Sequence, residues 1–285
     1  MIIQIEGGLF SRLDVLSSII NTKHYPDLIK IVWNPDEGVN AHFHELFEND
    51  IEFVNGNHYD DFTHEKYHPG THLDPRLEAS HTKYILADYP ILFEDTAKLG
   101  IFDACQVNHP FNNLFRQLKP VTVIQKVIDD ICFRYKDFHW YGFNIRRGIG
   151  LNYHPNSVIY SPTSIFITEA KKILEKHHKN RIVITTDSYE VLEQFCMEFY
   201  DKLIFIDDFK HWPINDGYNL AGMERTVIDW FLLTKCRRIY CSCSAGFALR
   251  AGRSFRIETN ELTSDDLKTV NYYAAAIERK RRGIF

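Results

Sequence analysis

The segment "RIVITTDSYEVLEQFCMEFYDKLIFID", residues 181–207, decides the fold. Its first part, 181–187, is rich in β-branched residues and is typical of a buried strand. Residues 188–200 have the apolar spacing of a helix, and residues 202–207 are strand-like again. A strand, a helix and a second strand with short connections predict a βαβ unit in a parallel sheet.

The same alternation continues on both sides of this segment. We expect a strand at 139–147, a helix at 161–178 with Ser161 as N-cap and Pro162 at its first position, and a helix at 223–236. A strand at 237–244, a helix from 245, a last strand at 254–258 and a terminal helix at 270–282 follow. This order predicts a doubly wound α/β domain.

The N-terminal half begins with a second βαβ pattern. A strand at 1–6, a glycine turn, a helix with apolar residues from Leu13 to Ile20 and a strand at 28–33 are expected, with a short strand possible at 51–55. Residues 55–82 look like a long loop, 83–93 return to a strand pattern, and 110–135 look like one or two helices broken at Pro120. We therefore predict two domains, 1–135 and 136–285.

Composition excludes several classes of protein. The 285 residues are 45% hydrophobic, which is ample for a packed core. Residues 1–135 hold 11 Lys and Arg against 20 Asp and Glu, a balance of −9, whereas residues 136–285 hold 22 against 18, a balance of +4. The sequence has no basic stripe with interleaved aromatic residues, so it does not indicate nucleic acid as a partner. Six cysteines fit reduced thiols, and with no signal pattern or membrane span we expect a soluble, cytoplasmic protein.

Three features fall at the carboxyl ends of predicted strands, where ligands bind to open parallel sheets. They are the adjacent arginines 146 and 147, the segment "TTDS" at 185–188, and "SCSAGF" at 242–247. Small hydroxyl residues and glycine at a helix start suit an anion, two arginines suit a phosphate, and a carboxylate suits ribose hydroxyls or a base edge. The predicted nucleotide-sugar site comprises Arg146, Arg147, Thr186, Asp187, Ser188, Ser242, Ser244, Ala245, Gly246 and Phe247.

Four motifs, in the right order along nearly the whole chain, resemble the GT-B fucosyltransferase superfamily. This superfamily contains the α1,2- and α1,6-fucosyltransferases, the nodulation type among them, and the protein O-fucosyltransferases. "NIRRGI" is similar to its His-x-Arg-Arg-Gly-Asp motif, with Asn144 and Ile149 as departures, and "TTDS" is similar to its later acidic motif. "IDWFLLTKCRRIYCSCSAGFALRA" resembles its last motif, and "GGLFSRL" resembles its N-terminal glycine motif.

The resemblance implies a GT-B fold, in which two Rossmann-like domains face each other across a cleft. The C-terminal domain would bind GDP-fucose, and the N-terminal domain would bind a glycan or peptide acceptor through Gly7, Gly8, Ser11 and Arg12. It also implies transfer with inversion, without a metal or another cofactor. Arg146 would contact the β-phosphate, and Arg147 would orient the loop or face the acceptor.

The base that would deprotonate the acceptor hydroxyl is left open by the sequence. His154 is the only obvious titratable base shortly after the paired arginines. Glu6, Asp14 and Asp88 in the N-terminal half are rivals, and a reaction without a protein base is a further alternative.

Three alternatives to fucose transfer also remain. The donor could be another NDP-sugar, or the protein could be a non-catalytic sugar- or nucleotide-binding module. The third is a metal-dependent hydrolase, because seven histidines lie between residues 42 and 81 and "HEKYH" at 64–68 matches H-E-x-x-H. That motif needs a long helix, whereas Pro69 and Gly70 follow it at once.

Overall fold

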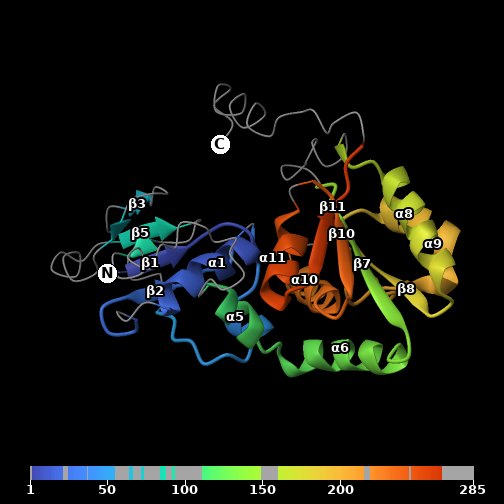
Figure 1. Cartoon of the computed structure of the whole chain (residues 1–285). Coiled ribbons are helices and arrows are strands. Elements are labelled where there is room, and N and C mark those ends of the chain that lie inside the picture. Colours follow the sequence, from blue (N-terminus) through green and yellow to red (C-terminus); the bar gives the residue numbers. More distant parts are fainter. Residues whose placement is uncertain are drawn as a thin grey trace. The chain divides into compact units, whose positions relative to one another are not determined.

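The computed structural model describes residues 2–21, 25–36, 38–54, 64–66, 72–73, 84–87, 92–93, 111–148, 160–214, 219–243 and 245–264 (Figure 1). Contacts divide the chain into two compact units. Unit 1 comprises Met1–Lys136, Ile206–Thr234 and Arg250–Ile257, and unit 2 comprises Asp137–Phe205, Lys235–Leu249 and Glu258–Phe285. The predicted domains, 1–135 and 136–285, stay a prediction, because a group of contacting residues is not the same as a separately folding domain.

Unit 1 is built on a four-stranded parallel sheet. Its strands are β1 (Ile2–Ile5), β2 (Lys30–Val32), β3 (His64–Lys66) and β5 (Tyr84–Ala87), in the order β2-β1-β5-β3. Strands β4 (His72–Leu73) and β6 (Leu92–Phe93) form a separate parallel pair. Because the winding direction reverses between β1 and β5, the turn after β1 lies at a topological switch point.

Helices of unit 1 pack through aromatic side chains. These helices are α1 (Leu9–Ile20), α2 (Phe43–Leu46), α5 (Phe111–Gln117), α6 (Thr122–Arg134) and α10 (Leu220–Leu233). Helix α1 contacts α5, and α10 contacts α6 and α2. Trp230 of α10 is buried, and its ring lies 5.4 Å from that of Phe10, 5.8 Å from Phe115 and 5.8 Å from Phe255, between ring centroids.

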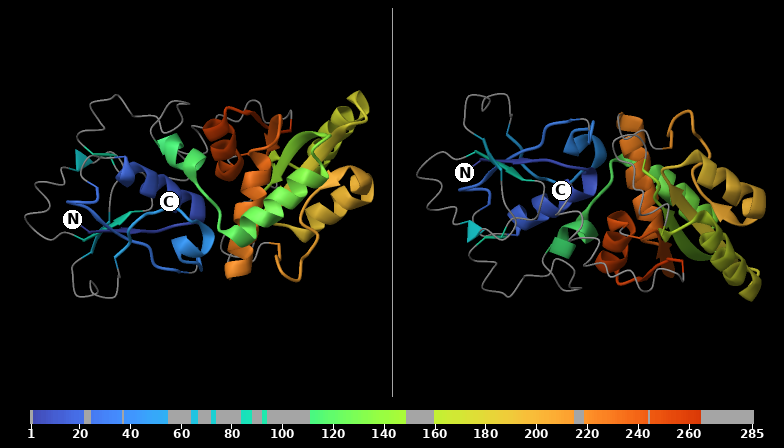
Figure 2. Two further views of the ribbon diagram at one scale, coloured as in Figure 1. Left: turned by 90° about the horizontal axis from the view of Figure 1, so that it is seen from below. Right: turned by 90° about the horizontal axis from the view of Figure 1, so that it is seen from above.

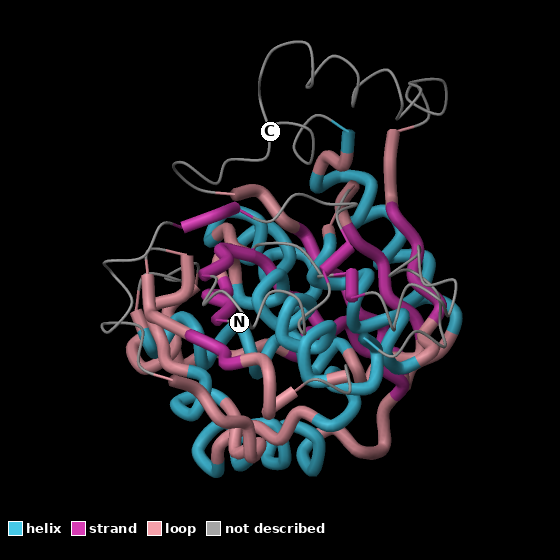
Figure 3. The backbone as a smooth tube through the Cα atoms, turned by 90° about the vertical axis from the view of Figure 1, so that its left-hand side faces the viewer, coloured by secondary structure: helices cyan, strands magenta, loops and turns pink. Residues whose placement is uncertain are grey.

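Unit 2 contains a five-stranded sheet in which every neighbouring pair is parallel. Its strands are β7 (His139–Ile145), β8 (Asn180–Thr186), β9 (Leu203–Ile204), β10 (Arg238–Cys241) and β11 (Glu258–Glu261), in the order β11-β10-β7-β8-β9. The connecting helices are α8 (Thr163–Lys176), α9 (Tyr189–Phe199) with the short η3 (Tyr200–Lys202), and α11 (Gly246–Phe255). Figure 3 distinguishes these strands, in magenta, from the helices, in cyan.

Phe143 of β7 anchors the core of unit 2. Its ring centroid lies 6.3 Å from that of Phe166 on α8, 6.0 Å from Phe195 on α9 and 5.1 Å from Tyr240 on β10. Helices α8 and α9, yellow to gold, lie side by side and contact each other (Figure 2). The alternating βα order predicted from the sequence is confirmed, because the helices return the chain to one end of a parallel sheet.

Three local expectations were wrong. Ser161 does not cap α8: Pro162 is the N-cap, and the Ser161 hydroxyl donates to the carbonyl of Leu262 (2.6 Å) instead. The last strand is not at 254–258, because α11 continues to Phe255 and β11 begins at Glu258. Residues 51–54 form no strand, although the Val54 N–H donates to the carbonyl of Ile31 (2.8 Å). The expected helix at 270–282 lies outside the described residues.

Two further findings concern the composition. In the part of the chain that the structure describes, no helix is long and apolar enough to cross a membrane. The cysteines found there are present as thiols, namely Cys132, Cys196, Cys236, Cys241 and Cys243.

A buried arginine joins the carboxyl ends of β1 and β2. The Arg12 side chain is 0% exposed; its Nε donates to the carbonyl of Gly7 (2.9 Å) and its Nη1 to the carbonyl of Asn34 (2.6 Å). Its Nη2 pairs with Asp36, and its guanidinium lies 5.4 Å from the centre of the Trp33 ring. The conformation of the glycine turn therefore depends on a cation in the interior.

We expect Arg12→Met to destabilise the protein by roughly 2–5 kcal/mol, because the partly buried carbonyls of Gly7 and Asn34 lose their donor and Asp36 loses its cation. Urea unfolding followed by circular dichroism measures the change. Asp36→Asn is the matched control: both carbonyls keep their Arg12 donor and the asparagine oxygen can still accept from Arg12, so the loss should be smaller than in Arg12→Met. Equal losses in the two variants would contradict this account of the buried guanidinium.

Candidate functional site

The sheet of unit 2 reverses its winding between β7 and β10. From β7 the chain adds β8 and β9 on one side, and then adds β10 and β11 on the other. Ligands of doubly wound proteins bind outside the carboxyl ends of the strands at such a switch point. The segments that follow β7 and β10 are Arg146–Gly148 and Ser242–Phe247, two of the three segments predicted from the sequence.

Two side chains, the partly exposed Asp187 and the buried Ser242, determine the path of the Arg-Arg loop, residues 146–148. One Asp187 carboxylate oxygen accepts the N–H of Arg147 (2.6 Å), and the other accepts the N–H of Gly148 (2.9 Å). The N–H of Arg146 donates to the hydroxyl of Ser242 (3.0 Å), which is 0% exposed. Gly148 has φ 70°, a left-handed conformation that glycine adopts without strain. The loop is thus bonded to the ends of both neighbouring strands, β8 and β10.

The two arginine side chains have different environments. Arg147 turns back into the unit: its Nη1 donates to the carbonyl of Arg146 (3.2 Å) and its Nη2 to the hydroxyl of Thr163 (2.9 Å). Burial lowers the pKa of Arg147, although Asp187 and Glu190 act against it. The partly exposed Arg146 guanidinium has no hydrogen-bond or ion-pair partner among the described residues. The Arg147 side chain therefore stabilises the loop, whereas the guanidinium of Arg146 is available to bind an anionic ligand.

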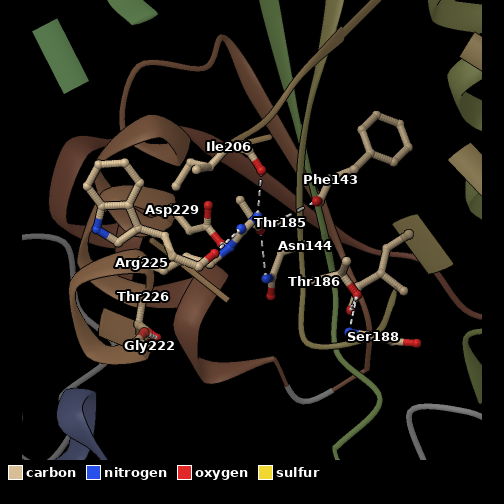
Figure 4. Close-up of polar contacts among 12 residues, drawn as sticks. Phe143, Asn144, Thr185, Thr186, Ser188, Ile206, Gly222, Arg225, Thr226 and Asp229 are labelled. Atoms are coloured by element: carbon tan, nitrogen blue, oxygen red, sulfur yellow. Dashed lines mark hydrogen bonds and ion pairs between the residues drawn. The ribbon is translucent and has the colours of Figure 1, made fainter. Parts of the chain in front are cut away.

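The hydroxyl residues at the end of β8 support the same frame. Thr186 donates to the carbonyl of Ile145 (2.7 Å) and accepts the N–H of Ser188 (3.2 Å), as Figure 4 shows. Ser188 is the N-cap of α9, and its hydroxyl accepts the N–H of Val191 (3.4 Å). A direct contact of Thr186, Asp187 or Ser188 with a nucleotide stays a prediction.

The segment after β10 leads into α11. The N–H of Cys243 donates to the Ser161 hydroxyl (2.9 Å), and the buried Ala245 donates its N–H to the carbonyl of Ser242 (3.1 Å). Because α11 begins at Gly246, the N–H groups of its first turn have no partner within the helix, and these favour an anion. Phe247 lies in that first turn. Ser244 and His154 lie outside the described residues.

Asn144 is a polar residue that the sequence did not place in the site. It is 7% exposed, and its Nδ2 donates to the hydroxyl of Thr185 (2.9 Å) across β7 and β8 (Figure 4). Its Oδ1 is buried without a hydrogen-bond partner among the described residues. Buried polar atoms are nearly always paired, so this oxygen is available to a donor from water or a ligand. Only the resemblance, in which Asn144 replaces a histidine, could have drawn attention to it.

The predicted acceptor residues lie at the switch point of unit 1. Gly7 has φ 84°, and the exposed Gly8 is the N-cap of α1, with open space where a Cβ would stand. Ser11 is partly exposed on the first turn of α1. Arg12 is fully buried, so it can shape the turn but offers no surface to an acceptor.

The rival bases differ in their surroundings. Asp14 pairs with Arg250, whose Nε donates to its Oδ2 (2.7 Å), while burial raises the pKa of Asp14 against the effect of Arg250. Glu6 is partly exposed and accepts from the Gln4 side chain (3.3 Å). Asp88 lies outside the described residues.

The described residues of the histidine-rich stretch give no support to a helical metal motif. His64–Lys66 forms strand β3, so the first residues of the H-E-x-x-H match are not on a helix. His42 and Glu45 form the capping box of α2, and His44 Nε2 lies 3.1 Å from the carbonyl oxygen of Ile51. Across the described ranges no three His, Cys, Asp or Glu side chains are arranged to hold a metal ion.

A buried ion pair on α10 was also missed from the sequence. Arg225 Nε lies 3.6 Å from Asp229 Oδ2, and the Arg225 guanidinium donates to the carbonyls of Trp212 (2.8 Å) and Ile206 (3.2 Å) (Figure 4). Burial raises the pKa of Asp229 to about 6, although Arg225 acts in the opposite direction. Asp229 Oδ1 has no hydrogen-bond partner within the described part of the chain. The helical spacing of four was visible in the sequence, but its burial was not.

No protein-family model matches the chain, and no curated protein matches it. Solved structures match most of it. The fucosyltransferase NodZ from Bradyrhizobium has 16% identity and a TM-score of 0.53, over 88% of this chain and 92% of that one. A mutant of Arabidopsis thaliana FUT1 in complex with GDP has 13% identity and a TM-score of 0.51, over 90% of this chain and 69% of that one. POFUT1 in complex with GDP-fucose has 7% identity and a TM-score of 0.55, over 92% of this chain and 97% of that one.

The chain therefore has the α/β fold of GT-B type that these fucosyltransferases share. This finding confirms the predicted fold class and the remote resemblance stated from the motifs. The arrangement of two domains that face each other across a cleft stays a prediction.

We expect the stability of the protein to fall as the pH rises from about 4 to about 6, in part because of Asp229. A carboxyl with a higher pKa in the folded than in the unfolded chain binds its proton more tightly when folded, so losing that proton destabilises the fold. Two pKa units correspond to about 3 kcal/mol. Asp229→Asn should remove this part of the pH dependence in urea unfolding series, whereas the exposed Asp130→Asn should not. An unchanged pH profile in Asp229→Asn would rule out the buried carboxyl as the cause.

Proposed function

We propose that the protein is a glycosyltransferase that moves a sugar from a nucleoside-diphosphate donor to a hydroxyl group of a glycan or peptide. The proposed donor is GDP-fucose, and transfer proceeds with inversion and without a metal ion or another cofactor. The observation that carries the proposal is the guanidinium of Arg146, which has no partner among the described residues, on a loop bonded to Asp187 and Ser242 at the switch point of the sheet. Structural neighbours that were crystallised with GDP or GDP-fucose support this choice of donor.

Arg146 would stabilise the leaving group. In an inverting transfer the acceptor oxygen forms a bond to the anomeric carbon while the bond from that carbon to the β-phosphate oxygen breaks. Both electrons of the broken bond pass to the diphosphate, so its negative charge grows in the transition state. A guanidinium whose backbone is bonded to two strand ends would stabilise that charge with little movement of the loop itself. The N–H groups at the start of α11 would add to this effect.

The loop bonds explain why one arginine can serve this role. Arg147 and Asp187 use their side chains to position the backbone that follows Arg146, and the Ser242 hydroxyl accepts the N–H of Arg146 itself. Because the loop is ordered when the protein folds, less conformational entropy is lost when a ligand binds to it. We therefore assign Arg147 a positioning role within the site, and Arg146 the contact with the diphosphate.

The acceptor proton would pass to a base that approaches from the acceptor side. His154 is our candidate in the donor half. Of its rivals, Asp14 is held by Arg250 although burial raises its pKa, and the partly exposed Glu6 has no cation bound to it among the described residues. Direct transfer of the proton to the departing diphosphate remains the alternative without a protein base.

A thermal-shift screen of GDP, UDP, dTDP and CMP, run with EDTA present, tests the donor. A nucleotide at 100 times its dissociation constant should stabilise the fold by about 2.7 kcal/mol, and we expect GDP to do so without a metal. Stabilisation by UDP or dTDP but not by GDP would replace fucose by another NDP-sugar. Stabilisation only after a divalent ion is added would contradict metal-independent binding.

We expect Arg146→Ala to reduce transfer at least ~10-fold, because a charge-assisted hydrogen bond contributes roughly 1.5–3 kcal/mol. The effect on turnover should exceed the effect on GDP binding, since the phosphate charge is greatest in the transition state. Arg146→Lys should restore little, because an ammonium lacks the planar fork. Release of GDP and calorimetric GDP titration measure the two effects.

The exposed Arg134→Ala on α6 is the matched control and should leave both values unchanged. Circular dichroism checks that each variant is folded. Normal turnover in a folded Arg146→Ala variant would remove the principal support for the proposal. GDP binding without sugar transfer to any acceptor tested would instead favour a nucleotide-binding module.

A further inference from the structure

A second group of cationic side chains lies at the opposite edge of the sheet in unit 2. Strands β8, β7 and β10 are adjacent and parallel, so their amino ends meet at one edge. The N–H of His139 donates to the carbonyl of Lys179 (2.9 Å), and the N–H of Arg237 donates to the carbonyl of Trp140 (2.9 Å). We call His139, His177, His178, Lys179 and Arg237 the histidine edge. Strand β7 has seven residues, so this edge lies about 20 Å from the Arg-Arg loop.

The three imidazoles of the histidine edge are stacked. The ring centroids of His139 and His177 are 5.2 Å apart, and those of His177 and His178 are 4.6 Å apart, with interplanar angles of 31° and 22°. Across the described residues no three His, Cys, Asp or Glu side chains are arranged to hold a metal ion, so these imidazoles do not form a metal site.

The histidine edge carries little compensating negative charge. The pKa of His177 is lowered by desolvation and then by its positive neighbours, which are His178, His139, Lys179 and Arg237. The acids at its border are paired: Asp201 with Lys202, 2.8 Å apart, and Glu258 with Arg238. Asp137 and Glu175 are exposed near its ends in sequence. Two permanent cations, Lys179 and Arg237, beside a row of imidazoles make the local potential positive in a chain of net charge −5.

The backbone beneath these side chains is firmly bonded. Arg181 donates through Nη1 to the carbonyls of His178 and Asn180, both at 2.8 Å, and its guanidinium lies 3.8 Å from the centre of the Phe138 ring. The N–H of Lys179 donates to His177 Nδ1 (3.1 Å), which places the proton of neutral His177 on Nε2. The Nε2–H of neutral His177 is therefore available as a donor to a ligand, and protonation of Nδ1 at lower pH replaces the bond from Lys179.

We propose that the histidine edge is an anion-binding site whose ligand carries a phosphate group, and that it binds this group more tightly as its imidazoles become protonated. The exposed Lys179 ammonium and Arg237 guanidinium supply permanent charge, and His177 and His178 supply charge that grows as the pH falls. A phosphate monoester offers several acceptor oxygens and up to two charges near neutral pH, which matches several donors on an open edge. This site goes beyond the proposed transferase activity and does not depend on it.

Histidine proton NMR, followed through a pH titration with and without inorganic phosphate, tests the site directly. An anion favours the protonated imidazole, so phosphate should raise the pKa of His177 and His178, whereas sodium chloride at equal ionic strength should not. Each imidazole is observed separately, so phosphate bound near Arg146 does not affect the pKa values measured for the histidine edge. The Arg146→Ala variant, which removes that second phosphate site, should give the same shifts.

The double variant His177→Gln/His178→Gln tests the contribution of the imidazoles. Phosphate affinity, measured by calorimetry at pH 5.5 in the Arg146→Ala background, should fall about tenfold, as for the loss of one charge-assisted hydrogen bond. Lys172→Gln is the matched control, because it removes an exposed charge from α8 outside the histidine edge and should not change the affinity.

Vesicles separate the two sources of a phosphate group. We would compare sedimentation with phosphatidylcholine vesicles that contain or lack phosphatidylglycerol, at pH 5.5 and 7.5. Binding only to the anionic vesicles assigns the site to a lipid headgroup, and binding of inorganic phosphate alone assigns it to a free phosphate or phosphate ester. The proposal is overturned if neither binds at pH 5.5, or if the folded double variant binds as the unmodified protein does.

Discussion

The carboxylate of Asp187 determines the shape of the loop on which the proposed activity depends. Its two oxygens accept the N–H groups of Arg147 and Gly148, so a charge at the end of β8 orients the backbone at the end of β7. Ser242 performs the same task from β10. With both neighbours satisfied by the protein, the one cation without a protein partner among the described residues of this loop is Arg146. A diphosphate site requires a positive charge that the protein itself has not paired, and Arg146 supplies that charge in the proposed site.

The same physical solution occurs in unit 1 with the charges exchanged. There a buried cation, Arg12, bonds the carbonyls of Gly7 and Asn34 and pairs with Asp36. Asp36 in turn accepts the N–H groups of Gly38 (2.7 Å) and Val39 (2.9 Å). In each unit the loops at the switch point are thus supported by a fully buried side chain, Arg12 or Ser242, together with a carboxylate that is at least partly exposed, Asp36 or Asp187. Loops that must present a surface need their own backbone groups satisfied from beneath.

Much of the fold could be predicted because the strands of unit 2 are apolar runs separated by helices with clear apolar spacing. Residues 181–207 showed β8, α9 and β9 in order, and the helices on either side of Pro120 were also expected. The errors arose where tertiary contacts decided the outcome. Ser161 looked like an N-cap, but its hydroxyl bonds two distant backbone groups, at Leu262 and Cys243. The stretch at 254–258 looked like a strand, but α11 extends into it.

The candidate site follows the same division. The sequence by itself determined which residues stand at the carboxyl ends of the strands, because the order of strands and helices is written in local apolar patterns. Only the tertiary structure decided that Asp187 bonds the Arg-Arg loop, that Arg147 turns inward, and that Arg146 does not. These outcomes depend on which strand lies beside which, and parallel pairing across β10, β7 and β8 joins residues some 40 to 100 positions apart. No local pattern records such a distance, because the bonds form only when the sheet has assembled.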